Sequence, residues 1–238
     1  ETAGRIDVWV NNAGIGALGN FDEIPIEAHE QVIQTDLLGY VRGAHAVLPH
    51  FKRQQSGMLI NNISLGGWAA QPYAASYAAA KFGLRGFAES LRGELHAWPH
   101  IHVCNLYPAV MDSPGFRDGG NFTGRAVKPV PPVYDPRRTA RAIVRAAQYP
   151  RPSIYVGSVS RLARFAQAWL PGYSIANARL VETALGKAAP DATSSGNLFS
   201  PPTGERTIFS VAGCVALAAT CCCCTGPASA VATYFCIF

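Results

Sequence analysis

The chain has 238 residues and a formal net charge of +5, from 20 Lys and Arg against 15 Asp and Glu. Hydrophobic residues make up 49% of it and charged residues only 15%, which excludes a disordered chain and suits one domain with a sizeable core. The basic residues are scattered along the chain rather than gathered in a stripe, so nothing indicates nucleic-acid binding.

The first half of the chain alternates apolar strands with long helices. Residues 6–10 are a short apolar run that ends in Asn-Asn-Ala-Gly, which is typical of a buried parallel strand and a turn. A long helix is predicted from residue 26 to about residue 53, a strand at 58–63 and an Ala-rich helix at 74–98. Such alternation predicts a parallel sheet with helices on both faces, an α/β fold.

The pattern continues further along the chain. A third strand is predicted at 101–106, followed by a Gly- and Pro-rich stretch at 113–133 that has no periodic run and is interpreted as a substrate loop. A helix is expected from residue 135 to about 148, then a last strand at 153–156. Two more helices are expected between residues 158 and 187, divided at Pro171-Gly172. The domain is placed at residues 1–190.

The end of the chain differs in composition. Residues 191–206 are interpreted as a linker, and residues 207–238 carry no charge. A spanning helix needs about 20 apolar residues, so this tail is long enough for a membrane anchor. However, Gly226-Pro227 interrupts it, and four consecutive cysteines at 221–224 resemble translation in a wrong reading frame. An anchor and a sequence artefact stay as equal alternatives.

Cysteine usage indicates the compartment. Cys104 is the one cysteine of the expected domain, and the others follow Gly213 without the spacing of a zinc site. Adjacent cysteines are poor disulfide partners. We therefore expect no metal, no disulfide framework and a cytoplasmic protein, which would be associated with a membrane only through its tail.

Tyr77 and Lys81 carry the clearest chemical signal. They are four residues apart, so the phenol and the ammonium would share one face of the predicted helix. A lysine charge near a phenol favours the phenolate. A hydroxyl from Ser64, delivered by another element, would hold a carbonyl oxygen beside the phenol. This arrangement predicts a proton-transfer site for carbonyl–alcohol chemistry.

With four such landmarks in order, the chain resembles the short-chain dehydrogenase/reductase family: Asn11–Gly14, Ser64, Tyr77–Lys81 and Tyr107–Ser113. The resemblance runs from about residue 4 to about residue 190. It implies a Rossmann-like doubly wound parallel sheet. The glycine-rich turn that cradles the cofactor pyrophosphate in the family is not found before residue 6, so we expect an N-terminally truncated member that lacks its first βαβαβ half.

The resemblance also implies the role of each site residue. Tyr77 would be the general acid in reduction and the base in oxidation. Lys81 would favour the phenolate and contact the nicotinamide ribose, and Ser64 would bind the substrate oxygen. The cofactor would be NAD or NADP, with the preference left open, and its expected contacts are Asn11, Ala13, Gly14, Tyr77, Lys81, Pro108 and Ser113.

Asp36 departs from the family pattern, which has Asn at this position to support a proton-relay water. Its backbone carbonyl would keep part of that role, so we count Asp36 among the catalytic candidates. A carboxylate near Lys81 would also compete for the lysine charge and work against the phenolate. Reduced activity is an expected consequence.

The leading hypothesis is therefore an oxidoreductase that transfers a hydride between NAD(P)(H) and a carbonyl or secondary alcohol. The alternative is a catalytically inactive fragment that cannot bind a dinucleotide, and a third reading is a membrane-anchored reductase of a lipophilic substrate. A sugar-nucleotide epimerase is disfavoured by the Asn-Asn-Ala-Gly turn. The resemblance also implies a homodimer or tetramer formed through the helices at 28–53 and 74–98.

Overall fold

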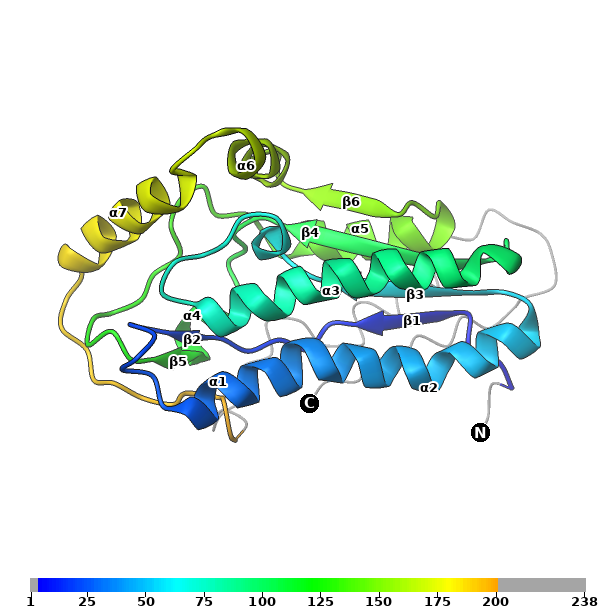
Figure 1. The fold of residues 1–238 in the computed structure, drawn as a ribbon, viewed down its shortest axis with the longest axis horizontal. Helices are drawn as coiled ribbons and strands as arrows, with labels where there is room; N and C mark the ends of the chain where they lie inside the picture. The colour runs from blue at the N-terminus through cyan, green and yellow to red at the C-terminus, as the bar shows by residue number, and fades with distance from the viewer. Residues whose placement is uncertain (1–3, 201–238) are drawn as a thin grey trace.

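The computed structural model describes residues 4–200. Its main sheet has four parallel strands in the order β1-β3-β4-β6 (Figure 1). These are β1 (Val8–Asn11), β3 (Gly57–Asn62), β4 (Ile101–Pro108) and β6 (Ser153–Val156). The predicted parallel sheet is thus confirmed, with each strand at its expected place in the sequence.

Helices cover both faces of this sheet. On one face, α2 (Gly39–Gln54) and α3 (Ala75–Glu94) run side by side along the strands, and on the other lies α5 (Arg137–Gln148) (Figure 1). The strand side chains alternate accordingly: Leu59 and Val103 pack with α2 and α3, whereas Ile60 and Cys104 pack with α5. The sheet is doubly wound, as expected.

The long helix predicted from residue 26 is continuous but not uniform. It consists of α1 (Ile26–Ile33), a π-helical turn (Gln34–Leu38) and α2. Single π turns within helices occur often at functional sites. This turn carries Asp36, whose side chain is fully buried.

A second, two-stranded sheet lies beside the start of α1. In it, β2 (Ala17–Leu18) pairs in parallel with β5 (Gly120–Asn121), which follows the short helix α4 (Gly115–Asp118). The stretch at 113–133, which has no periodic pattern, therefore contains some regular structure. Its pairing with β2 depends on residues about 100 positions away in the chain, which local periodicity does not reveal.

Two helices close the described part of the chain, α6 (Ser158–Trp169) and α7 (Tyr173–Gly186), and they are separated at Pro171-Gly172 as predicted. Residues 191–200, expected to form a linker, contact the domain: Leu198 is 2% exposed and Ser194 pairs with Asn121. The uncharged tail at 207–238 lies outside the described residues. No helix among residues 4–200 is long and apolar enough to cross a membrane.

Candidate active site

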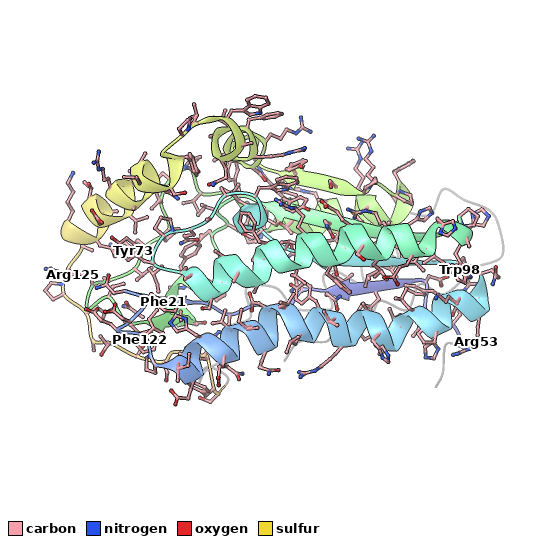
Figure 2. All side chains as sticks on the ribbon, in the orientation of Figure 1. Phe21, Arg53, Tyr73, Trp98, Phe122 and Arg125 are labelled. Atoms are coloured by element: carbon pink, nitrogen blue, oxygen red, sulfur yellow. The ribbon has the colours of Figure 1, made fainter. Side chains whose placement is uncertain are left out.

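Most of the sequence-predicted residues gather where β1 and β3 end and α3 begins, and Pro108 and Ser113 lie apart from them. This is the end of the molecule at which Phe21, Tyr73 and Phe122 lie, while Arg53 and Trp98 lie at the opposite end (Figure 2). The carboxyl ends of parallel strands meet at one edge of the sheet, where open α/β proteins bind their ligands. Tyr77 and Lys81 lie in the first two turns of α3.

The centre of the site is a buried ion pair between Lys81 and Asp36. The Lys81 Nζ lies 2.9 Å from the Asp36 Oδ2, and the two side chains are 2% and 0% exposed. The backbone N–H of Ile15 donates to the other carboxylate oxygen of Asp36 at 2.8 Å. The π turn thus brings a carboxylate from the α1–α2 segment onto the lysine of α3.

Burial and charge act against each other in this pair. Burial raises the pKa of the Asp36 carboxyl, and the Lys81 charge and the Ile15 N–H offset part of that rise. Burial alone would lower the pKa of the Lys81 ammonium, but Coulombic attraction to Tyr40 in its phenolate form and to the Asp36 carboxylate more than compensates and raises it. Lys81 therefore stays charged in the interior.

Two tyrosine rings flank the lysine. Its Nζ lies 5.3 Å from the centre of the Tyr77 ring and 5.2 Å from that of Tyr40. Tyr40 is buried, and its hydroxyl donates to the Asn62 carbonyl at 2.9 Å. Burial raises the pKa of Tyr40 to about 12, so this phenol stays protonated at neutral pH. Tyr77 is only half-buried and is the more accessible of the two phenols.

Ser64 meets Tyr77 across Gly66. The Ser64 Oγ accepts the Gly66 N–H at 3.0 Å, and a methyl group at Gly66 would lie 3.5 Å from that Oγ and 3.1 Å from the Tyr77 Cε1. The backbone of Ser64 has φ 153° and ψ 163°, a region used almost exclusively by glycine, and such strain is concentrated at functional sites. Because its oxygen accepts from Gly66, the Ser64 hydroxyl can still donate its own proton.

In the Asn-Asn-Ala-Gly turn, Gly14 faces the site and Asn11 makes structural contacts. A methyl group at Gly14 would lie 3.5 Å from the Asp36 Oδ2 and 3.6 Å from the Lys81 Nζ, so this glycine lies against the ion pair. Asn11 instead points toward α2 and donates to the Tyr40 carbonyl at 3.2 Å. Ala13 is half-buried between them.

Asn11 begins a ladder of amides that crosses three strands. Its Nδ2 donates to the Asn61 Oδ1 at 2.9 Å, the Asn61 Nδ2 to the Asn105 Oδ1 at 3.2 Å, and the Asn105 Nδ2 to the Tyr107 hydroxyl at 3.2 Å. The parallel register places the three asparagines side by side. This asparagine ladder fixes the strand ends that carry the site.

The remaining expected cofactor contacts lie apart from the ion pair. Pro108 is the buried last residue of β4 and pairs with Val156 of β6. The Ser113 N–H donates to the Met111 carbonyl at 2.9 Å. Within residues 4–200, no hydrogen bond or ion pair joins Pro108 or Ser113 to Lys81 or Asp36.

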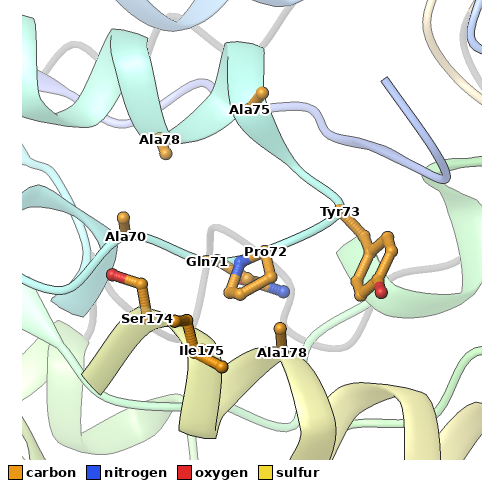
Figure 3. Close-up of a pocket in the computed structure, with 9 residues that line it drawn as sticks. All are labelled: Ala70, Gln71, Pro72, Tyr73, Ala75, Ala78, Ser174, Ile175 and Ala178. Carbon is orange, nitrogen blue, oxygen red and sulfur yellow. The ribbon is translucent and has the colours of Figure 1, made fainter. Parts of the chain in front are cut away.

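A cavity of about 500 Å³ lies between the start of α3, the loop before it and α7 (Figure 3). It touches α3 at Ala75 and Ala78 rather than at Tyr77, so it lies beside Tyr77 and not on it. Its wall is mostly apolar and consists of Ala70, Gln71, Pro72, Tyr73, Ala75, Ala78, Ser174, Ile175 and Ala178.

Few polar contacts hold α7 over this cavity. The Tyr73 hydroxyl donates to the Glu182 carboxylate, and the Asn177 Nδ2 donates to the Ala70 carbonyl at 3.4 Å. None of the residues of α7 is fully buried. The helix therefore rests on the loop before α3 through these two hydrogen bonds and through partly buried side chains.

Two features of the site were missed by sequence reasoning. Tyr40 follows Asp36 by four positions in the predicted helix, a spacing that places it on the same face. Asn61 and Asn105 interrupt otherwise apolar strands near their ends, and a buried amide in such a place needs a partner.

In the residues that the structure describes, no group of His, Cys, Asp and Glu side chains is arranged to hold a metal.

Comparison with known families gives one match that covers half of the chain. The sequence profile described as "short chain dehydrogenase" matches residues 1–120. Among curated proteins, "Uncharacterized oxidoreductase YxnA" of Bacillus subtilis is 31% identical over 174 residues, which are 72% of this chain and 49% of that protein. "3-ketodihydrosphingosine reductase" of Bacteroides thetaiotaomicron is 37% identical over 120 residues, covering 50% of this chain and 44% of that one. The chain spans about half the length of the curated relatives it matches.

Solved structures show the same fold. A short chain dehydrogenase from Burkholderia cenocepacia, crystallised in complex with NADP, superposes with a TM-score of 0.60 at 22% identity and covers 77% of this chain and 72% of that one. A short-chain dehydrogenase from Streptomyces avermitilis gives the same TM-score at 23% identity, with 77% and 71% covered.

Proposed function

The chain belongs to the short-chain dehydrogenase family, and on that basis we propose that it is an NAD(P)-dependent oxidoreductase of a carbonyl or secondary alcohol. The observation that carries the proposal is the buried Lys81 ammonium beside the Tyr77 ring, with Ser64 facing that ring across Gly66. Relatives named as oxidoreductases and a neighbour solved with NADP support it.

The residues around Lys81 suit the ribose end of a nicotinamide nucleotide. The Lys81 ammonium has three N–H donors, and the ion pair with Asp36 occupies one of them. Gly14 leaves open the space beside this pair that a side chain would fill. When bound, the cofactor supplies or accepts the hydride. Lys81, Gly14 and Tyr77 would hold its ribose and nicotinamide portion, and the choice between NAD and NADP stays open.

The protein moves the proton. In reduction, the Ser64 hydroxyl donates a hydrogen bond to the substrate oxygen, and the Tyr77 hydroxyl gives its proton to the alkoxide as the hydride reaches carbon. The phenolate left on Tyr77 is stabilised by the charge of Lys81. In oxidation the same phenolate removes the proton from the alcohol. Asp36 positions Lys81 for both reduction and oxidation and weakens the effect of the lysine charge on Tyr77.

Substitution of Tyr77 by Phe tests this assignment. The purified chain is first titrated with NADH and NADPH by fluorescence and then assayed on a panel of ketones and aldehydes. Because Phe cannot donate the proton, kcat should fall by roughly 10² to 10⁴, while the nucleotide affinity changes little. Tyr73→Phe, which removes a phenol four residues earlier, in the loop before α3, that is bonded to Glu182, is the matched control and should keep its kcat.

Two outcomes would count against the proposal. Undiminished turnover by Tyr77→Phe would remove Tyr77 from the chemistry. Failure of the chain to bind either nucleotide would favour the alternative, a chain that cannot hold a dinucleotide by itself.

Assembly is also part of the proposal. In Figure 1, α2 and α3 lie side by side on one face, and a homodimer or tetramer would form through them. The mass in solution, measured by light scattering after gel filtration, tests this expectation.

A further inference from the structure

Helix α6 turns its large apolar side chains outward, whereas an ordinary surface helix turns them toward the core. Its inward side carries Ser160 and Ala163, which are buried, and the Ser160 hydroxyl donates to the Tyr107 carbonyl at 2.7 Å. Its outward side carries Leu162, Phe165 and Trp169, which are 68%, 58% and 79% exposed. The spacing of three and four places these large side chains on one stripe, here called the α6 apolar face.

Polar interactions, rather than apolar packing, hold the inward side. The Arg164 guanidinium lies 4.3 Å from the Trp68 ring centre and donates to the Tyr155 hydroxyl at 2.8 Å. This contact fixes the rotation of α6 and so keeps the apolar stripe turned outward. A contiguous row of exposed large apolar side chains marks an interaction surface, whereas single exposed apolar residues are ordinary.

The charged residues of the chain segment that contains α6 are all basic, up to Glu182 on α7. Every charged residue between Asp135 and Glu182 is an arginine. Arg161 is exposed and lies next to Leu162, one turn before Phe165. Tryptophan, phenylalanine and leucine on one side of a helix, with arginine at its border, are typical of helices that lie in a membrane interface.

We propose that the α6 apolar face docks the protein on an anionic lipid surface, with Leu162, Phe165 and Trp169 in the acyl boundary and Arg161 at the headgroups. Acidic headgroups complement a segment that carries only positive charge. This is peripheral binding and is distinct from a membrane span. It goes beyond the proposed reaction and does not depend on it.

A second copy of the chain fits this face less well. A symmetric dimer would place the same patch on both subunits, and α6 has no acidic residue that could pair with Arg161 of the other copy. A stable protein interface also needs about 20 to 30 residues on each side, whereas a single apolar stripe of α6 suffices for interfacial insertion.

Docking would also place the cavity near the lipid. Helix α7 directly follows α6, and its Ile175 is 62% exposed and lines the 500 Å³ cavity beside the site. An apolar molecule held in the bilayer would therefore meet this cavity without crossing bulk water.

Flotation of the full chain with vesicles tests the proposal. Vesicles of mixed phosphatidylcholine and phosphatidylserine are compared with phosphatidylcholine alone, using wild type, Trp169→Gln, Phe165→Gln and Arg161→Gln. We expect binding to the mixed vesicles that weakens at high salt, about fivefold weaker for Arg161→Gln and roughly tenfold or more for each apolar variant. The fluorescence of Trp169 should shift to the blue on binding, which Trp169→Phe would identify by difference.

Ile26→Gln is the matched control. Ile26 is 60% exposed on α1 but is followed by Glu27 in an acidic segment, so its replacement should leave vesicle binding unchanged. Circular dichroism confirms that each variant is folded. The uncharged tail at 207–238 is present in all variants, so binding that persists undiminished in the α6 variants would overturn the proposal. A concentration-dependent dimer that Trp169→Gln abolishes, with no vesicle binding, would overturn it in favour of a second copy.

Discussion

At the scale of single residues, Asp36 is the side chain that most changes the expected chemistry. It forms a 2.9 Å ion pair with Lys81, and both side chains are almost fully buried. The Asp36 carboxylate favours the charged form of the buried lysine, and we expect it also to weaken the effect of the lysine charge on Tyr77.

Asp36→Asn should separate these two effects. The amide can still accept the Ile15 N–H, but it leaves the buried Lys81 charge without a counterion, which should lower the free energy of unfolding by about 3 kcal/mol. The uncompensated charge should favour the phenolate of Tyr77, so the pH profile of kcat/KM should shift to lower pH. Urea unfolding and a pH–rate series measure the two effects.

The control for this substitution is Glu89→Gln. Glu89 is 57% exposed and lies 4.0 Å from Arg85, so losing it should cost less than about 1 kcal/mol and leave the pH profile unchanged. An unchanged profile for Asp36→Asn would mean that Asp36 does not act on the lysine charge that Tyr77 senses.

At the scale of elements, the asparagine ladder ties the ends of β1, β3 and β4 together. Asn61 is its middle member and is 0% exposed, with one hydrogen bond to Asn11 and one to Asn105. A buried amide that loses its partner pays its full desolvation cost. The ladder therefore holds the strand ends at the spacing on which the site depends.

Asn61→Ala should destabilise the protein by roughly 3 kcal/mol, because it opens a cavity and leaves an Asn11 donor and an Asn105 acceptor unpaired. The neighbouring Asn62→Ala removes a less buried bond to Asn12 and keeps the backbone carbonyl that accepts from Tyr40, so its cost should stay below about 1 kcal/mol. Chemical denaturation compares the two. Equal costs would show that the ladder adds nothing beyond ordinary side-chain packing.

At the scale of the whole molecule, the buried site makes global stability depend on pH at the alkaline end. The pKa of Tyr40 is raised from 10.0 to about 12 by burial, and that of Lys81 is also raised. Both groups hold their proton more firmly in the folded state than in the unfolded one. Their contribution is therefore fully present below about pH 10 and is lost as the pH rises toward 12.

Tyr40→Phe tests this linkage. At about pH 8 the variant should lose about 1 kcal/mol of unfolding free energy with its hydrogen bond to Asn62. Between about pH 8 and pH 11 the wild type should then lose roughly 1 kcal/mol more than the variant, because only the wild type has the phenol to titrate. Urea titrations at both pH values measure this, and parallel losses would show that Tyr40 does not titrate in folding.

The sequence by itself determined the class of fold and named the residues of the candidate site. Short continuous apolar runs placed the strands, and period-3.6 patterns placed the helices, since these patterns report which local faces are buried. Local spacing placed Tyr77 and Lys81 on one helix face, and the resemblance added Ser64. The role of each residue in turnover stays a prediction for the kinetic tests above.

Only the tertiary structure decided which distant side chains these residues contact and which way α6 faces. The π turn that delivers Asp36 to Lys81, the register that aligns three asparagines, and the outward turn of the apolar stripe of α6 all depend on contacts between distant segments. Periodicity reports that a face is apolar, but it does not report whether that face meets the core or the solvent. That choice is made by packing, and in α6 the contacts of Ser160 and Arg164 made it.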